Sequence, residues 1–140
     1  MWKALSSVAA VLGLTSTPRA VTAQTENAKT YKLSPEEIRS LAKGRGGAIA
    51  SDRITVDGKA VGYMYRTAPR NPQDSGWAFL AGDETPAYMD DTSRHAIYDV
   101  NTIANYDPEI IPLLDAPVGS AFLRGPNGLV PDPEGAPSEE

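Results

Sequence analysis

The sequence predicts an α+β fold: an antiparallel sheet of about five strands, with an N-terminal helix and short helical turns packed on one face. The order of the predicted elements leads to this prediction, since a helix, a hairpin, two strands, helical turns and a last strand follow one another along the chain. Three features of the composition agree with it. The chain has 140 residues, which is enough for one domain. Its hydrophobic content of 41% is ordinary for a globular core. Its 12 glycines and 12 prolines favour short elements joined by turns over a helical bundle.

Residues 34–43 carry the pattern of a short N-terminal helix. Ser34 suits the N-cap, Pro35 suits the first helical position, and Glu37 completes a capping box. Apolar residues form one stripe behind this start, and Gly44 suits the helix end. A helix this short needs a sheet to pack against.

A β-hairpin is predicted next, because Asp57-Gly58 is the pair preferred in a two-residue type I′ turn. Pairing outward from this turn sets Val56 opposite Lys59. The alternation of side chains then separates the hairpin into a core face and an outer face. The core face would carry Ala50, Ile54, Val56, Val61, Tyr63 and Tyr65, and the outer face Ser51, Arg53, Thr55, Ala60, Gly62 and Met64.

The remaining strands are predicted at residues 77–81, 96–100 and 118–124, with loops at 67–74 and 82–94. Helical turns are expected at 87–90 and after Asp107-Pro108, a cap followed by a first-turn proline. The folded domain is thus expected over residues 34–124. Residues 125–140 are acidic and proline-rich, and are predicted to be a disordered tail.

Residues 1–23 have the pattern of a secretory signal peptide. Lys3 precedes an uncharged stretch at 4–14 that is too short to span a bilayer, and residues 21–23 (VTA) fit a cleavage site before Gln24. Residues 24–33 are polar and read as a flexible lead-in. The prediction is a periplasmic or secreted protein without a stable membrane span. An uncleaved anchor and a frayed cytoplasmic tail are the alternatives.

The charge and the absence of cysteine limit the possible partners and chemistry. The net charge is −5, and loss of Lys3 and Arg19 with the signal peptide would make it −7. Such a chain repels nucleic acid and suits a basic partner protein. With no cysteine, thiol catalysis and thiolate metal sites are excluded. The sequence predicts no cofactor, and it leaves the oligomeric state open.

Few residues form a recognisable catalytic pattern. His95 is the only histidine, and Ser75 lacks the flanking glycines of a nucleophile elbow, so a solvated loop histidine is the better interpretation. The acidic residues do not follow a calcium-loop spacing. Two of these acids facing each other across a cleft could still hydrolyse a glycoside.

Candidate binding residues gather where acidic turns meet aromatic side chains. Acids there would steer a basic partner, and a partly exposed aromatic would anchor it. Trp77, Phe79, Tyr63 and Tyr65 could form a platform for a carbohydrate or a peptide, but aromatic residues at strand spacing more often build a core. Trp77 and Phe79 share one face of their predicted strand, so burial in the core is the competing interpretation of both. The candidate residues are Asp74, Trp77, Asp83, Glu84, Tyr88, Asp90 and Asp91.

Several blocks of the chain resemble the Imm33 immunity-protein family, also called DUF2185. The resemblance spans roughly residues 46–124, and its most specific part is the DSGW and GDE pair. The blocks are residues 47–54 (GAIASDRI), 61–66 (VGYMYR), 74–77 (DSGW), 82–84 (GDE), 98–103 (YDVNTI) and 114–122 (LDAPVGSAF).

This resemblance implies a small α+β domain, not an enzyme, that binds and neutralises a cognate bacterial toxin by occlusion. It implies no catalytic residues. The export signal and the acidic tail depart from the family pattern, and an exported member would meet its toxin outside the cytoplasm. Two alternatives stay open: an exported ligand- or envelope-binding domain, and a small carboxylate-dependent hydrolase.

Overall fold

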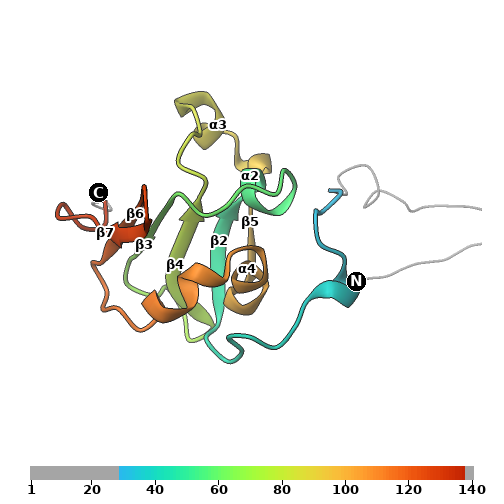
Figure 1. Ribbon diagram of the computed structural model, residues 1–140, viewed down its shortest axis with the longest axis horizontal. Helices are drawn as coiled ribbons and strands as arrows, with labels where there is room; N and C mark the ends of the chain where they lie inside the picture. The colour runs from blue at the N-terminus through green and yellow to red at the C-terminus, as the bar shows by residue number, and fades with distance from the viewer. Residues whose placement is uncertain (1–28, 138–140) are drawn as a thin grey trace, which may run out of the picture. The chain divides into compact units, whose positions relative to one another are not determined.

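Within residues 29–137, which the computed structural model describes, six strands form one mixed sheet in the order β5-β2-β4-β3-β6-β7. The predicted signal peptide, residues 24–28 of the lead-in and residues 138–140 lie outside this range. Figure 1 shows the sheet with its helices. The strands are β2 (Gly47–Ser51), β3 (Tyr63–Arg66), β4 (Asp74–Leu80), β5 (His95–Asp99), β6 (Ala121–Gly125) and β7 (Gly128–Pro131).

The sheet is mixed because β2 runs parallel to β4, whereas the other neighbouring pairs are antiparallel. The prediction of a purely antiparallel sheet of about five strands was therefore wrong in this respect. The strand predicted at residues 96–100 is confirmed as β5, one residue earlier than expected. The strand predicted at 77–81 is longer than expected and begins at Asp74.

Helices cover one face of this sheet. The α4 helix (Val100–Tyr106) and the 3₁₀ helix η4 (Pro108–Leu113) lie across it in Figure 1. The cap predicted at Asp107 is confirmed, since its side chain accepts a hydrogen bond from the Glu109 amide at 3.1 Å. Buried residues of the two helices pack on the sheet and form the core with Ala50, Met64, Trp77, Phe79 and Phe122.

The predicted N-terminal helix is reduced to the 3₁₀ turn η2 (Pro35–Glu37). The predicted reach-back of Glu37 is present, because its Oε1 accepts from the Ser34 amide at 2.8 Å. The helix does not continue, since the amides of Leu41 and Ala42 both donate to Asn101 Oδ1 in α4, at 2.7 and 2.8 Å. A side chain of another element has replaced the intrahelical acceptors.

The predicted hairpin at Asp57-Gly58 is also absent. Ser51 instead caps the short α2 helix (Asp52–Thr55), its side chain accepting from the Arg53 amide at 3.0 Å. Gly58 has a φ of +81°, which suits the end of a helix as well as a type I′ turn. Ala50, Ile54 and Val61 of the predicted core face are buried as expected. In β3 the faces are reversed, because Met64 is fully buried while Tyr63 and Tyr65 point away from the helices.

The chain end beyond residue 124 is partly ordered, in contrast to the predicted disordered tail. Pro126 and Asn127 form a two-residue turn between β6 and β7, with Gly125 paired to Gly128. The partly buried Leu129 packs against the core cluster. A hydrophobic contact and a tight turn are thus enough to add a sixth strand to a proline-rich segment.

Candidate binding surface

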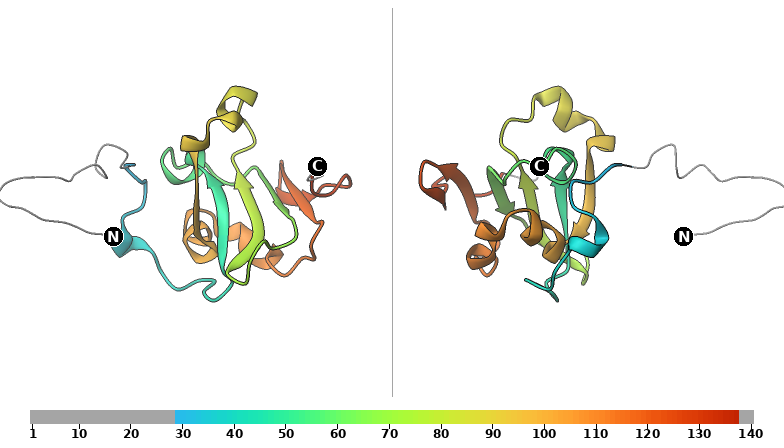
Figure 2. Two further views of the ribbon diagram at one scale, coloured as in Figure 1. Left: turned by 180° about the vertical axis from the view of Figure 1, so that it is seen from behind. Right: turned by 45° about the vertical axis from the view of Figure 1, so that its right-hand side comes forward.

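The sheet has a second face that no helix of the described chain covers, as Figure 2 (left) shows from behind. Strand alternation places mostly apolar side chains on this face, which we call the open face. Ile97 is 74% exposed there, Val130 48% and Leu123 42%. The apolar residues of the open face are Ile49, Tyr63, Tyr65, Ala78, Leu80, Ile97, Ala121, Leu123 and Val130. His95 and Asp99 of β5 share this face, and Ala78 and Leu80 are buried among their neighbours. A sheet face that meets only water is normally polar, so this one is suited to binding.

The open face has a hollow at one end, which we call the large hollow. It has a volume of about 860 Å³. Tyr63, Leu80 and Leu123 form its floor, and Met89 beyond the strand ends adds a further apolar side chain. Asp83, Glu84 and Asp132 contribute carboxylates, and Lys59 and Arg124 contribute the two cations.

A second hollow, the small hollow, lies at the β2–β5 side of the sheet and has a volume of about 650 Å³. Ile49 and Ile97 supply its apolar wall, and Arg70, Asp74 and Asp99 supply its charges. Asp74 accepts from the amides of Arg70 and Gly76, both at 2.9 Å. Burial raises the pKa of Asp74, but these two amides outweigh it and hold the pKa below its ordinary value.

Two of the three acids that line the large hollow, Asp83 and Glu84, are already bound within the protein. Arg53 holds Asp83 through two hydrogen bonds, Nε to Oδ1 at 3.1 Å and Nη2 to Oδ2 at 2.6 Å, and these lower the pKa of Asp83. The Glu84 carboxylate accepts from the amides of Ala81 and Gly82, at 2.8 and 2.9 Å. Burial raises the pKa of Glu84, but these amides bring it below its ordinary value.

This arrangement does not favour acid–base catalysis. The pKa values of Asp83 and Glu84 are both lowered, so neither side chain retains a proton near neutral pH, as a general acid must. Ser75 Oγ donates to the Gly47 carbonyl at 2.6 Å on the helix-covered side, whereas His95 contacts the Tyr88 carbonyl at 3.3 Å. Among residues 29–137, no three acids or histidines are grouped so as to hold a metal ion.

Comparison with protein families identifies the fold. The family model described as the immunity protein Imm33 domain matches residues 48–131. The chain belongs to the Imm33 family. The resemblance predicted from the sequence blocks is therefore confirmed, and the match extends through β7. Searches of curated proteins and of solved structures gave no match. Membership of an immunity-protein family indicates a binding protein rather than an enzyme, with a toxin as the general class of partner.

The predicted site residues of this Imm33 domain fall into separate places. Asp83 and Glu84 line the large hollow, and Asp74 lines the small hollow. Asp90 ends α3 (Pro86–Asp90), and Asp91 caps η3 (Thr92–Arg94) through its bond to the Ser93 amide at 3.0 Å. The predicted helical turn at 87–90 is thus confirmed.

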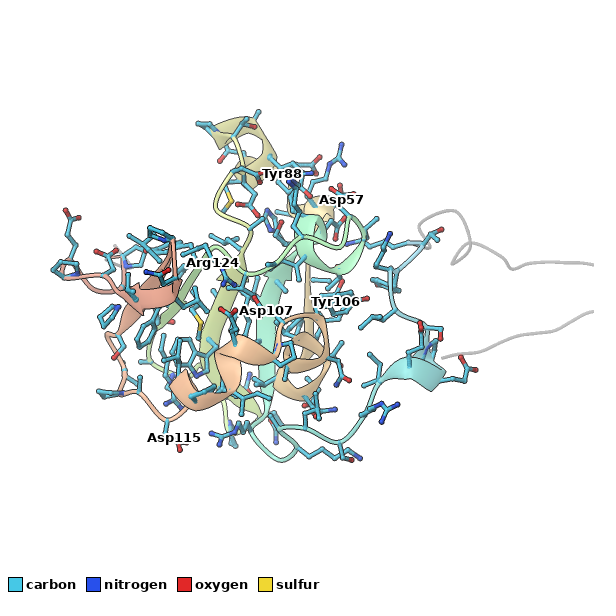
Figure 3. The ribbon with its side chains drawn as sticks, viewed as in Figure 1. Asp57, Tyr88, Tyr106, Asp107, Asp115 and Arg124 are labelled. Carbon is cyan, nitrogen blue, oxygen red and sulfur yellow. The ribbon has the colours of Figure 1, made fainter. Side chains whose placement is uncertain are left out.

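Two predicted aromatic anchors have different surroundings. Trp77 is 2% exposed on the helix-covered side of the sheet, stacked on Phe79 with centroids 6.0 Å apart, so it cannot contact a partner. The interpretation of Trp77 and Phe79 as core residues is therefore confirmed. Tyr88 is partly exposed, and the Arg94 guanidinium lies 5.3 Å from its ring centroid. Figure 3 shows Tyr88 beside α3, away from Asp107 and Arg124.

The predicted site residues did not include the apolar residues of the open face, of which only Tyr63 and Tyr65 were considered, as part of a possible aromatic platform. Their signal is present in the sequence, because apolar side chains occupy both alternating positions of several strands. In β6, Phe122 faces the core and Leu123 faces outward, and in β2 Ile49 lies between two buried alanines. A strand that is apolar on both sides indicates that both faces of its sheet are covered, the second one either by another part of the chain or by a partner in a complex. Within residues 29–137, no helix is long and apolar enough to cross a membrane.

Proposed function

We propose that this protein is an exported immunity protein that binds a toxin protein and neutralises it by occlusion. The open face is the observation that carries the proposal, since it offers a mostly apolar surface bounded by two hollows. Burying such a surface is the main source of favourable free energy in protein association. Membership of the Imm33 family gives the class of partner.

The charge of the chain supports a basic protein as the partner. Without residues 1–23 the chain would carry a net charge of −7. Loops 67–74 and 82–94 end beside the two hollows, and Asp90 and Asp91 on the second loop are exposed. Loop 82–94 is acidic, whereas Arg70 offsets Asp74 in loop 67–74. An acidic loop beside an apolar surface attracts a basic protein and repels phosphate backbones, so we do not propose nucleic acid as a partner.

Export is part of this proposal and rests on residues 1–23. A charged residue, a short apolar stretch and a small-x-small site before Gln24 have the order of a cleavable signal. We place the mature protein in the periplasm or outside the cell. The toxin would then act there, and a toxin with a cytoplasmic target would be a poor candidate.

The decisive experiment is a pull-down with residues 24–140 as bait, from the envelope fraction and culture medium of the source organism. We expect one protein partner, bound in stoichiometric amount, whose toxic activity the bait abolishes in a growth assay. A partner that binds but keeps its full toxicity would contradict neutralisation. A correctly folded bait that captures no protein would contradict the proposal as a whole.

The steering role of the acidic loop has a separate test. Asp90→Lys and Asp91→Lys together should lower the association rate with the captured partner by about tenfold. Asp91 also caps η3 and pairs with Arg94, so the unfolding midpoint of the double variant is measured together with its rate. Asp83 and Glu84 are left unchanged, because Arg53 and two backbone amides bind them. Glu36→Lys is the matched control, an exposed acid on η2. An unchanged rate in the double variant would refute a steering role for this loop.

An exported domain that binds a small ligand or an envelope polymer is the second candidate. The large hollow favours it, since a volume of about 860 Å³ falls within the range of small-molecule sites. The same pull-down separates the two candidates. A bait without a protein partner that is stabilised against heat by an oligosaccharide or peptidoglycan fragment would support this second function.

A further inference from the structure

The large hollow combines an apolar floor with a side that is rich in acids. The rings of Tyr63 and Tyr65 are in contact, with centroids 5.5 Å apart. Tyr63, Leu80 and Leu123 together form the floor of the hollow. Leu123 and Met89 are 42% and 40% exposed, so both have surface left to bury against a partner. A side chain of a partner placed here would therefore contact apolar groups on several sides.

The cations around this hollow are already neutralised. Arg53 pairs with Asp57 and Asp83, and the distance from its Nη2 to Asp83 Oδ2 is 2.6 Å. Arg124 pairs with Asp107 at 2.6 Å and also contacts Glu109, as Figure 3 shows for Arg124 and Asp107. Lys59 lies 4.0 Å from Asp83. These cations have little capacity left to attract an acidic partner.

Asp132 and Glu134, which follow β7, have no cation partner within residues 29–137. Asp132 Oδ1 accepts only a hydrogen bond from the Glu134 amide, at 3.0 Å. Both carboxylates act on the hydroxyl of Tyr63, whose pKa is raised first by burial and then by these charges. The negative field at this side of the hollow is thus not compensated within the described chain.

We infer that the large hollow is the anchor point for the partner, and that it binds an apolar side chain flanked by lysine or arginine. The apolar side chain would lie on Tyr63, Leu80 and Leu123, and the neighbouring cation would pair with Asp132, which lines the hollow, and with Glu134 next to it. This inference rests on the proposed function and names the chemistry of the toxin segment that is bound. Aromatic and aliphatic groups in such hollows dominate binding energies, with charges around them setting specificity.

The test uses three short synthetic peptides and backbone amide NMR of residues 24–140. One peptide combines leucine and phenylalanine with lysine, the second has glutamate in place of lysine, and the third has serine in place of the apolar residues. We expect only the first to shift amide signals, with the shifts at Gly62, Tyr63, Leu80 and Leu123. Equal binding of the acidic peptide, or shifts confined to the small hollow, would overturn the inference.

Two variants test the anchor directly, on the peptide and on the captured toxin. Leu123→Asp should weaken the affinity for the peptide and for the toxin by about tenfold each. The double variant Asp132→Lys and Glu134→Lys should weaken both affinities to the same extent, because it repels the cation of the bound segment. Val118→Asp is the matched apolar control, because Val118 is 53% exposed but lies outside the open face. Unfolding midpoints establish that each variant is folded.

The outcomes separate this inference from the proposed function. A toxin that is neutralised equally by wild type and by the Leu123 and acid variants would leave the function standing and overturn the anchor. A first peptide that binds the hollow, with no toxin captured, would support the anchor chemistry and contradict the proposed function. Self-association of the protein that Leu123→Asp abolishes would assign the hollow to a second copy and overturn the inference.

Discussion

The indole of Trp77 is enclosed by three elements of the core. It stacks on Phe79 in the same strand and on Phe122 of β6 at 6.4 Å, and its Nε1 donates to the Leu114 carbonyl at 3.2 Å. The guanidinium of Arg66 lies 5.7 Å from its ring centroid. This residue is therefore a structural support for the sheet, although it belongs to the most specific block of the family pattern.

Replacing Trp77 with alanine should lower the free energy of unfolding by about 3–5 kcal/mol, because the change leaves a cavity. It also removes the indole hydrogen bond to the Leu114 carbonyl, which keeps only a long bond from Arg66 Nη1 at 3.5 Å. Urea denaturation measures the effect. Tyr88→Ala is the control and should cost less than about 1 kcal/mol, since Tyr88 is partly exposed on α3. A Trp77 variant of wild-type stability that no longer bound the toxin would show that the core assignment is wrong.

Glu84 should make stability depend on pH in the acid range. Its folded-state pKa lies below the ordinary value of 4.5, so the carboxylate stabilises the fold above that pH. This contribution is lost as the pH falls from 4.5 through the folded-state pKa. Glu84→Gln should therefore lower stability at neutral pH and flatten its decline in acid, as measured by urea unfolding across the pH range.

The control for this prediction is Glu36→Gln, since Glu36 is exposed on η2. Its acid decline should match that of the wild type. If Glu84→Gln and the wild type lost stability in parallel as the pH fell, the Ala81 and Gly82 amides would not be stabilising the Glu84 carboxylate.

At the scale of elements, two glycines allow β3 and β4 to pair closely at both ends. A Cβ atom at Gly62 would lie 1.9 Å from the Ala81 carbonyl oxygen, and one at Gly76 would lie 2.1 Å from that of Thr67. Both distances are far below the van der Waals contact distance. The obstructing atoms belong to the backbone, so they cannot move away as a flexible side chain could. The glycines in the VGYMYR and DSGW blocks are thus explained by the approach of two strands.

Gly62→Ala should destabilise the protein by about 1–3 kcal/mol through this overlap. Gly125→Ala is the matched control, because a Cβ there meets nothing closer than 3.5 Å and the backbone φ is not positive. Thermal unfolding of both variants makes the comparison. Equal midpoints for the two would mean that β3 and β4 separate at this end at little cost.

Structural features that depend only on a residue and its immediate neighbours were predicted well from the sequence. The caps at Ser34 and Asp107 and the turn at 87–90 are examples. The hairpin predicted at Asp57-Gly58 was wrong, because a positive φ at Gly58 suits a helix end as well as a hairpin turn. Only the core contacts of α2 decide between the two. The parallel pairing of β2 with β4 joins residues far apart in sequence, so no local pattern predicts it.

The residues of the candidate site were likewise predicted where local sequence decides their position, and not where the arrangement of the strands decides it. Sequence reasoning found acids that line both hollows, since acidic turns are visible in the chain. It placed Tyr63 and Tyr65 in the core because the assumed hairpin fixed their alternation. Once β3 pairs with β4 and β6 instead, both tyrosines lie on the open face. The binding surface therefore depended on strand order, which is a property of the whole sheet.

At the scale of the whole molecule, the excess of 18 acids over 13 bases should make toxin binding depend on salt. Raising the ionic strength from about 0.01 M to about 0.15 M shortens the screening length from about 30 Å to about 8 Å. We expect the association rate to fall by about tenfold and the dissociation rate to change little. Stopped-flow measurements with the captured toxin test this expectation.

A variant with Asp90→Asn, Asp91→Asn, Asp132→Asn and Glu134→Gln is the comparison. Its association should be slow at low salt and almost independent of ionic strength. An equally steep salt dependence in this variant would place the steering charges elsewhere on the molecule.

The position of β2 in the sheet has a kinetic consequence. It lies between β4 and β5, and neither neighbour precedes it or follows it directly in the chain. The side of the sheet formed by β5, β2 and β4 can close only after residues 47–51 have met both 74–80 and 95–99. Contacts between segments so far apart in the chain require long loops to close first, and the entropy lost in closing them slows folding, to times of roughly milliseconds to seconds. Under the export that we propose, such a delay would keep this side of the sheet open until its later strands had arrived across the membrane.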